Sequence, residues 1–375
     1  MKIETISVHA GRKVDPATGA VIPPIYLSVT FEREKNREYP KGYNYARSNN
    51  PNRESLEECL AKLENGKSAA VFSSGSAAAM SILQSLKPGD HIIAPEDIYH
   101  GTKHLIRLFE KWNISSDFVD MTNISSIENA LQNSTKLIWI ETPSNPLLKI
   151  IDIKKIVDIA KRKNAVTVCD NTWATPILQN PLDMGVDLVL HATTKYIGGH
   201  SDILGGAVIS KEENGTFTFV KEIQKSGGAV PSPFECWLVL RGIQTLPLRS
   251  REQSKSALMI AQFLKSRNEV EAVHYPGLKE HPGYDLAKEQ MKLSGGMLSL
   301  QVKGDKNEAL RLAANVNLFT RATSLGGSES LIEHRASIEG PGTKTPQNLL
   351  RLSIGLEHPD DLIEDLTQAF ANLQK

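Results

Sequence analysis

The chain has 375 residues, enough for two domains, and its 43 basic and 43 acidic side chains balance. This balance argues against a nucleic-acid or anionic-membrane partner. No apolar run approaches the length of a membrane span, and the first residues lack the apolar core of a signal peptide. The three cysteines show no CxxC spacing. We therefore expect a soluble, cytoplasmic protein whose thiols are reduced and buried.

The first 47 residues are polar, and four prolines break any long helix there. This composition predicts an irregular arm that packs on another part of the protein. Asn50 and Pro51 then have the order typical of a helix cap followed by proline in the first turn. Apolar residues recur at helical spacing up to Leu63, and Gly66 is expected to end this helix.

From residue 69 onward, short apolar strands alternate with helices. The strands are expected at 69–72, 91–94, 137–140, 166–169, 186–190 and 207–209, and the helices at 76–86, 102–112 and 153–163. Continuous apolar strands separated by helices predict a mostly parallel sheet that helices cover on both faces, which is an α/β fold.

The alternation loosens after about residue 235. Further on come a helix around 254–264, strand-like residues at 297–302 and then 310–314, and a last helix near 362–373. These elements predict a smaller α+β domain. We therefore divide the chain into an arm at 1–47, a large domain at 48–240 and a small C-terminal domain at 241–375.

Polar side chains follow three of the predicted strands. Glu141 and Asn145 follow the first of these strands, Asp170 follows the second, and the third leads toward Lys195. Ligands of α/β proteins bind beyond the carboxyl ends of parallel strands, so we expect these side chains to meet at one rim of the sheet. A desolvated lysine loses its proton near neutral pH and can form a Schiff base with a carbonyl group.

Such a set of side chains matches the needs of pyridoxal 5'-phosphate (PLP). Lys195 would hold the aldehyde, and the carboxylate of Asp170 would keep the pyridine nitrogen protonated. An aspartate after a strand also commonly begins a turn or caps a helix. Only the combination of Asp170 with Lys195 favours the cofactor.

The turn at 73–78 lies between a predicted strand and a predicted helix. Its backbone N–H groups, around Gly75 and Ser76, are the donors that a phosphate group needs. The turn matches neither the dinucleotide fingerprint nor the nucleotide P-loop, which leaves a nucleotide-binding oxidoreductase without its signature. A plain glycine turn is the alternative, and the hydroxyl of Thr194 is a further candidate donor.

Three more residues are candidates for the site. Tyr99, at the start of a helix, could stack on the cofactor ring, and Arg47, in the arm, could reach a phosphate. Arg351 is a charge inside an apolar strand-like run and needs a partner, either a structural carboxylate or that of a substrate. His191 and His200 flank the lysine loop without a third ligand at metal-type spacing, so we expect them to be structural and no metal to be bound.

Taken together, these stretches resemble the Cys/Met-metabolism family of PLP enzymes, which includes cystathionine γ-synthase, cystathionine γ-lyase, cystathionine β-lyase and methionine γ-lyase. The resemblance covers nearly the whole chain. Its strongest matches are residues 45–48, 141–146, 170–172, 194–196, 199–202 and 324–327. As a set they are very specific for this family.

The resemblance implies a fold-type I PLP-dependent transferase fold, with a small C-terminal domain and an extended N-terminal arm. It implies that Lys195 is the Schiff-base lysine and moves protons, that Asp170 pairs with the ring nitrogen, and that Tyr99 stacks on the ring and assists proton transfer. It also implies that Gly75, Ser76 and Thr194 hold the phosphate.

Family members are usually homotetramers with shared active sites. The resemblance therefore implies that Tyr45 and Arg47 reach the phosphate of a neighbouring subunit. It further implies that Arg351, Ser324 and Asn145 hold the α-carboxylate of a small sulfur amino acid.

The chain departs from the family pattern near the site. Ala192 stands where many members have a phosphate-binding serine, and Gly101 stands where methionine γ-lyases carry a cysteine. His104 and Thr323 replace an arginine and a glutamate that cystathionine γ-synthases and γ-lyases usually have. Gly101 argues against methionine as the substrate, and the last two differences leave the cleaved bond open.

The expected function is carbon–sulfur lysis in transsulfuration: cystathionine would be cleaved by β- or γ-elimination to a keto acid, ammonia and a thiol amino acid. The alternative is γ-replacement on an O-acylated homoserine, as in cystathionine γ-synthase. A non-catalytic amino-acid-binding protein is a remote third possibility, because the lysine, aspartate and arginine are all present.

Overall fold

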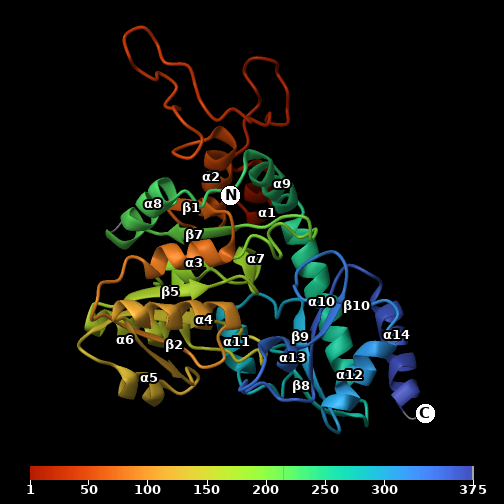
Figure 1. Cartoon of the computed structure of the whole chain (residues 1–375). Helices are drawn as coiled ribbons and strands as arrows, with labels where there is room; N and C mark the ends of the chain where they lie inside the picture. The colour runs from red at the N-terminus through yellow and green to blue at the C-terminus, as the bar shows by residue number, and fades with distance from the viewer. Residues whose placement is uncertain (214, 374–375) are drawn as a thin grey trace.

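The computed structural model describes residues 1–213 and 215–373 (Figure 1). Its larger sheet has the strand order β1-β7-β6-β5-β4-β2-β3. β7 runs antiparallel to both of its neighbours, and the other strands run parallel to one another. The strands are β1 (Ser68–Phe72), β2 (His91–Pro95), β3 (Ser115–Val119), β4 (Thr135–Glu141), β5 (Val166–Asp170), β6 (Leu188–His191) and β7 (Gly206–Ser210).

Helices cover both faces of this sheet, as its buried strands require. Side chains alternate along β1: Ala69 and Val71 pack in one apolar cluster with α2, while Ala70 and Phe72 pack in another with α3. The helices of this half are α2 (Pro51–Leu63), α3 (Gly75–Leu83), α4 (His100–Leu108), α5 (Ile124–Ala130), α6 (Ile153–Lys163), α7 (Thr175–Leu178), α8 (Gly215–Gly227) and α9 (Pro233–Ile243), with the 3-10 turns η1 (Phe109–Trp112) and η2 (Pro181–Met184).

A second sheet, with the order β10-β11-β12-β9-β8, forms after the long helix α10 (Leu246–Lys265). Its apolar face packs on α10, α12 and α14 in a separate core (Figure 1). Its strands are β8 (Val270–His274), β9 (Met297–Val302), β10 (Thr320–Arg321), β11 (Leu331–His334) and β12 (Leu349–Ser353). The remaining helices are α11 (Tyr284–Gln290), α12 (Lys306–Asn315), α13 (Arg335–Glu339) and α14 (Pro359–Leu373).

The expected α/β fold, with a mostly parallel sheet and a smaller second sheet, is confirmed. Two local expectations were wrong. The arm is not irregular throughout, because α1 (Ile3–His9) is helical and packs on α2 and α10. Residues 310–314 do not continue a strand-like run, because a capping box between Asp305 and Glu308 begins α12 there.

The chain between α1 and α2 projects away from the body as two long loops (Figure 1). Several of its apolar side chains are exposed, among them Val21, Leu27 and Val29. Among the residues described, no helix combines the length and apolar character that crossing a bilayer requires. The domain boundaries near residues 47 and 240 stay predictions.

Candidate active site

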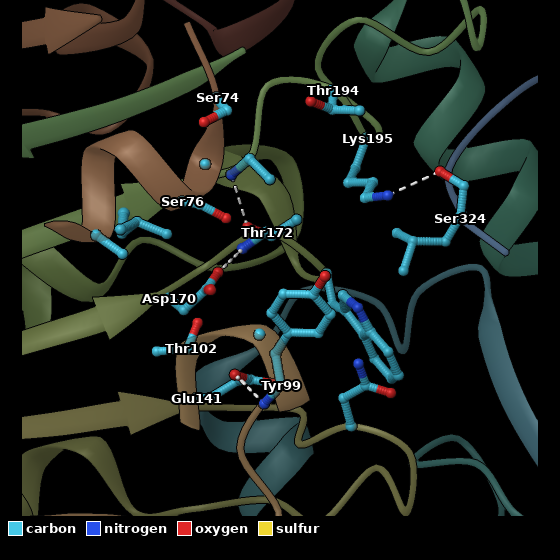
Figure 2. A pocket seen from close by; sticks show the side chains of 18 of the residues that line it. Ser74, Ser76, Tyr99, Thr102, Glu141, Asp170, Thr172, Thr194, Lys195 and Ser324 are labelled. Atoms are coloured by element: carbon cyan, nitrogen blue, oxygen red, sulfur yellow. Dashed lines mark hydrogen bonds between the residues drawn. The ribbon is translucent and has the colours of Figure 1, made fainter. Parts of the chain in front are cut away.

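A cavity of about 170 Å³ lies at the carboxyl ends of β4, β5 and β6, where the two sheets meet (Figure 2). The polar residues expected after those three strands all line it. Of the predicted site residues, Gly75, Ser76, Tyr99, Asn145, Asp170, Thr194, Lys195, Ser324 and Arg351 lie in its wall. The residues that this rule about strand ends brings together therefore line one cavity.

Lys195 follows β6 and points into the cavity toward Ser324 (Figure 2). Its Nζ donates a hydrogen bond of 2.7 Å to the Ser324 hydroxyl. Burial, and then the nearby Arg351 guanidinium, lowers the pKa of Lys195 to about 8. More of this amine is therefore neutral near pH 7 than in an ordinary exposed lysine, and the neutral form is the one that attacks a carbonyl or accepts a proton.

Ser324 holds an uncommon backbone conformation, with a φ of 119°. A non-glycine residue keeps such a conformation only where its surroundings hold it there. The Ser324 carbonyl accepts a hydrogen bond of 3.2 Å from Arg351, and its hydroxyl accepts from Lys195. These contacts hold Ser324 between the Lys195 amine and the Arg351 guanidinium.

Asp170 is the last residue of β5, and Glu141 lies beside it in the register of β4. Asp170 accepts a hydrogen bond of 3.0 Å from the Thr172 backbone N–H. Burial raises the pKa of Asp170, and burial followed by repulsion from Asp170 raises the pKa of Glu141 well above its usual range. A cation placed against Asp170 would favour its charged form, which is how a protonated pyridine nitrogen would interact with it.

Glu141 also positions Tyr99. Its carboxylate accepts a hydrogen bond of 2.9 Å from the Tyr99 backbone N–H, at the start of α4. The Tyr99 ring stands in the cavity near Asp170 (Figure 2). A Cβ atom at Gly101 would lie 2.6 Å from this ring, so a larger residue at 101 would displace Tyr99.

Close backbone contacts shape the turn before α3. The Ser74 hydroxyl caps the helix by accepting a hydrogen bond of 3.0 Å from the Ala77 N–H. A Cβ atom at Gly75 would lie 2.9 Å from the Cβ of Ala192, and one at Gly206 would lie 2.3 Å from the Ser74 carbonyl oxygen. Only glycine allows these approaches, which leave the first N–H groups of α3 beside the cavity.

This donor set fits the phosphate of PLP, because a helix N-terminus attracts anions. Thr194 lines the same wall, but its hydroxyl already exchanges hydrogen bonds with the backbone of Gly205, at 2.9 and 3.2 Å. With the amine of Lys195 and the carboxylate of Asp170, the residues present match the three polar parts of the cofactor.

Arg351 lies on β12, directly opposite Glu333 on β11. One of its nitrogens donates to Glu333 at 2.6 Å, and another donates to the Asn145 side chain at 3.1 Å. Burial, and then the nearby Arg335, lowers the pKa of Arg351 to about 10. The buried charge of Arg351 is therefore paired with a structural carboxylate, that of Glu333, and the Arg351 side chain still lines the cavity.

Several cavity residues escaped the sequence analysis. Arg335, the first residue of α13, donates to Glu333 at 3.0 Å and to Glu339 at 3.2 Å, so two buried arginines share one carboxylate. This cluster depends on how β11 and β12 align, which no local pattern predicts. Trp173 had a signal, since it directly follows the Asp170 motif, and its ring lies 5.9 Å from the Arg351 guanidinium.

Two predicted residues lie outside the cavity. Tyr45 is 46% exposed in the arm, and Arg47 donates a hydrogen bond of 2.6 Å to the Lys225 carbonyl. Their contact with a neighbouring subunit stays a prediction. Of the residues that depart from the family pattern, Ala192, Gly101 and Thr323 line the cavity, whereas His104 does not.

His191 is fully buried at the end of β6. Its Nε2 lies 2.6 Å from a carboxylate oxygen of Glu64, which is also buried. Within residues 1–213 and 215–373, no three His, Cys, Asp or Glu side chains cluster as metal ligands would. His191 therefore forms a buried contact with Glu64 beneath the site.

Comparisons with known proteins match this geometry. The family described as Cys/Met metabolism PLP-dependent enzyme matches residues 4–371. The chain is 46% identical to a cystathionine γ-synthase of Mycobacterium leprae, over 98% of this chain and 96% of that protein. It is 43% identical to a cystathionine β-lyase of Coxiella burnetii, over 98% of this chain and 97% of that protein. The crystal structure of metB from Corynebacterium glutamicum superimposes with a TM-score of 0.97 at 42% identity, covering 100% of this chain and 98% of that one.

The chain belongs to the Cys/Met metabolism PLP-dependent enzyme family. Its cofactor is PLP, and its relatives place it among the enzymes of methionine and cysteine metabolism that handle cystathionine. The expected family and cofactor are confirmed. The relatives include both a synthase and a lyase at similar identity, so the reaction of this chain has to be argued from its own residues.

Proposed function

We propose that the chain is a carbon–sulfur lyase of transsulfuration, which cleaves cystathionine by β- or γ-elimination to a keto acid, ammonia and a thiol amino acid. The observation that carries this proposal is the Lys195 amine. Its pKa is lowered to about 8, and it lies in one cavity with Asp170 and Arg351. A neutral amine in that place can accept a proton from a bound amino acid.

Six residues of the cavity have a proposed role in holding the cofactor. Lys195 holds it covalently through Nζ, Asp170 pairs with its ring nitrogen, and Tyr99 stacks on its ring. Gly75 and Ser76 bind its phosphate through backbone N–H groups, and Thr194 supports that wall. When bound, PLP stabilises the negative charge that develops on the substrate carbon next to the amino group.

Binding and orientation of the substrate are proposed to depend on the second sheet. Arg351 pairs with the α-carboxylate, because a guanidinium offers two parallel N–H donors. Asn145 and Ser324 already contact Arg351, and they complete this subsite. Glu333 balances the charge of Arg351 from behind, so that the guanidinium stays in place before the substrate arrives.

Proton transfer is proposed to fall to Lys195, with help from Tyr99. After its release from the cofactor, the neutral Nζ accepts the proton of the α-carbon, and its hydrogen bond to Ser324 sets the direction of the amine. Elimination at the β-carbon would release homocysteine and leave pyruvate, and elimination at the γ-carbon would release cysteine and leave 2-oxobutyrate. In both cases water supplies the oxygen of the keto group, and ammonia is the third product.

A second candidate is γ-replacement on an O-acylated homoserine. The similarity to a cystathionine γ-synthase of Mycobacterium leprae, at 46% identity, favours it. In that reaction the sulfur of cysteine replaces the acyloxy group on the γ-carbon, which leaves as a free carboxylate, and no keto acid accumulates. Product that forms only when both an O-acylhomoserine and cysteine are supplied would establish this reaction.

The proposed assembly is a homotetramer in the cytoplasm, with Tyr45 and Arg47 reaching the phosphate of a neighbouring active site. The exposed apolar side chains of the arm support this assembly, since such surface is usually covered. The three cysteines are free and buried, which suits a reducing compartment. Light scattering on the purified protein would give the subunit number, and a monomer would contradict the shared site.

The deciding experiment identifies by mass the keto acid that the PLP-loaded protein releases from L-cystathionine. Pyruvate would establish β-elimination, and 2-oxobutyrate would establish γ-elimination. Release of neither would refute the lyase. The matched control is Lys195→Ala, which should lose turnover and the absorbance of the lysine-bound cofactor together, and a variant that kept both would refute the part given to Lys195.

A further inference from the structure

A second cavity, of about 480 Å³, lies beside the first one. Its wall comes from the loop after β2, from one face of α4, from the loop after β4, and from the segment 339–345 that joins α13 to β12. Asn145 lines both cavities, so they adjoin at this side chain. None of the roles proposed above for the active-site residues involves this second cavity.

Basic side chains line this cavity from opposite sides. His100, Lys103 and Arg107 stand at positions i, i+3 and i+7 of α4, which places them along one face of the helix. Lys149 and Lys344 face them from the other two segments. Burial, and then repulsion from Arg107 and Lys344, lowers the pKa of Lys103. These three cations are therefore close enough to repel one another.

The carboxylates of the wall are already engaged. Glu96 pairs with Lys149 at 3.3 Å and with Lys344 at 3.0 Å. Glu339 accepts a hydrogen bond of 3.2 Å from Arg335, which belongs to the cluster behind the first cavity. Asp97 hydrogen-bonds to Ser144, and burial raises the pKa of Asp97, so its negative charge is disfavoured.

Two cations are left without a carboxylate. Lys103 donates to the backbone carbonyl of Glu96 at 2.5 Å, and Arg107 lies with its guanidinium carbon 5.5 Å from the ring centre of Phe118. Within the described ranges 1–213 and 215–373, neither forms an ion pair. Such a pair of cations at the wall of a cavity offers a site for an anion.

We propose that this second cavity binds a carboxylate group of an amino acid through Arg107 and Lys103. Two sources share this chemistry. One is the distal carboxylate of a long substrate whose α-amino acid end lies against Arg351, and this source rests on the proposed lyase function. The other is a second, free carboxylate compound, whose occupancy would reach the active site through Asn145, because Asn145 accepts a hydrogen bond from Arg351.

The first test is a calorimetric titration of the PLP-loaded protein with glutarate at low ionic strength. Arg107→Gln and Lys103→Gln should each weaken glutarate binding roughly five- to tenfold, as the loss of one charge-assisted hydrogen bond does. Lys111→Gln, an exposed charge in η1 outside the cavity, is the matched control and should bind as the wild type does. Within residues 1–213 and 215–373, Arg107 is exposed, lies against the Phe118 ring and forms no ion pair, so its replacement should leave the melting temperature unchanged.

The second test separates the two sources. KM is measured for L-cystathionine and for an S-ethyl thioether amino acid that is cleaved at the same carbon but has no distal carboxylate. A rise in KM for cystathionine alone, in Arg107→Gln, supports the distal carboxylate. Weakened glutarate binding with equal effects on both substrates supports the free carboxylate.

The inference would be overturned if both variants bound glutarate as tightly as the wild type and kept the wild-type KM values. It would also be overturned if the wild-type protein did not bind glutarate and the variants kept the wild-type KM values. The glutarate titration needs no turnover. If the protein releases no keto acid from cystathionine, the lyase fails, but the titration still decides whether the cavity binds carboxylates.

Discussion

Replacing Lys195 with methionine is expected to stabilise the cofactor-free protein at pH 7. The pKa of Lys195 falls from 10.5 to about 8 in the cavity. One pKa unit corresponds to about 1.4 kcal/mol, so the buried ammonium disfavours folding by about 3 kcal/mol. Methionine removes this charge and also the 2.7 Å hydrogen bond to Ser324, whose loss costs about 1 kcal/mol. The expected net gain is about 2 kcal/mol in the free energy of unfolding.

The gain should depend on pH in a defined direction. Below pH 8, Lys195 is charged in both the folded and the unfolded chain, so the full penalty applies there. Between pH 8 and 10.5 the folded protein holds the amine neutral while the unfolded chain is still protonated, and the penalty disappears as the pH rises through this range. Lys195→Met should therefore lose its advantage at pH 10.5.

Urea unfolding at pH 7 and at pH 10.5, at one protein concentration, measures both effects. Lys111→Met, at an exposed position, is the control and should change the free energy of unfolding by no more than about 0.5 kcal/mol. A Lys195→Met protein less stable than the wild type at pH 7 would refute the reasoning. An equal gain at both pH values would refute it as well.

Three further outcomes follow from the site. Glu333→Gln leaves two buried arginines without their shared carboxylate and should lower the free energy of unfolding by about 3–5 kcal/mol in urea, whereas Glu128→Gln, in an exposed pair, should lower it by less than about 1 kcal/mol. Asp170→Asn keeps an oxygen for the Thr172 N–H but loses the charge, so turnover should fall at least about 100-fold while the cofactor stays bound, as absorbance will show. Gly206→Ala pushes against the Ser74 carbonyl and should weaken PLP binding in equilibrium dialysis, whereas Gly215→Ala, with open space around it, should not.

Elements with strong local signals were predictable from the sequence. The cap and proline at Asn50 and Pro51 located the start of α2, and α6 has the predicted bounds. The strand β3 was missed, because its sequence begins Ser-Ser-Asp and it lies at the edge of the sheet with partly exposed side chains. A polar edge strand lacks the apolar run that identified the central strands.

The site was predictable as far as single strand ends allow. The parallel-sheet rule predicts that Asp170 and Lys195 meet at one rim of the sheet, and both line the same cavity. Contacts across the second sheet were not predictable, because Glu333 meets Arg351 only through the antiparallel alignment of β11 and β12. The second cavity shares this limit, since its cations come from segments far apart in the chain.

The antiparallel strand β7 has a consequence for how the protein is made. β1 is complete at Phe72, but its partner β7 ends at Ser210, and the turn that follows β1 is shaped by contact with Gly206. Ribosomes add roughly 5–20 residues per second, and pairing between distant strands waits for the later one. A nascent chain that has not yet reached β7 therefore contains the residues of the phosphate turn without their final shape. Capture of the vitamin-derived cofactor should begin only after this strand has emerged and closed the sheet.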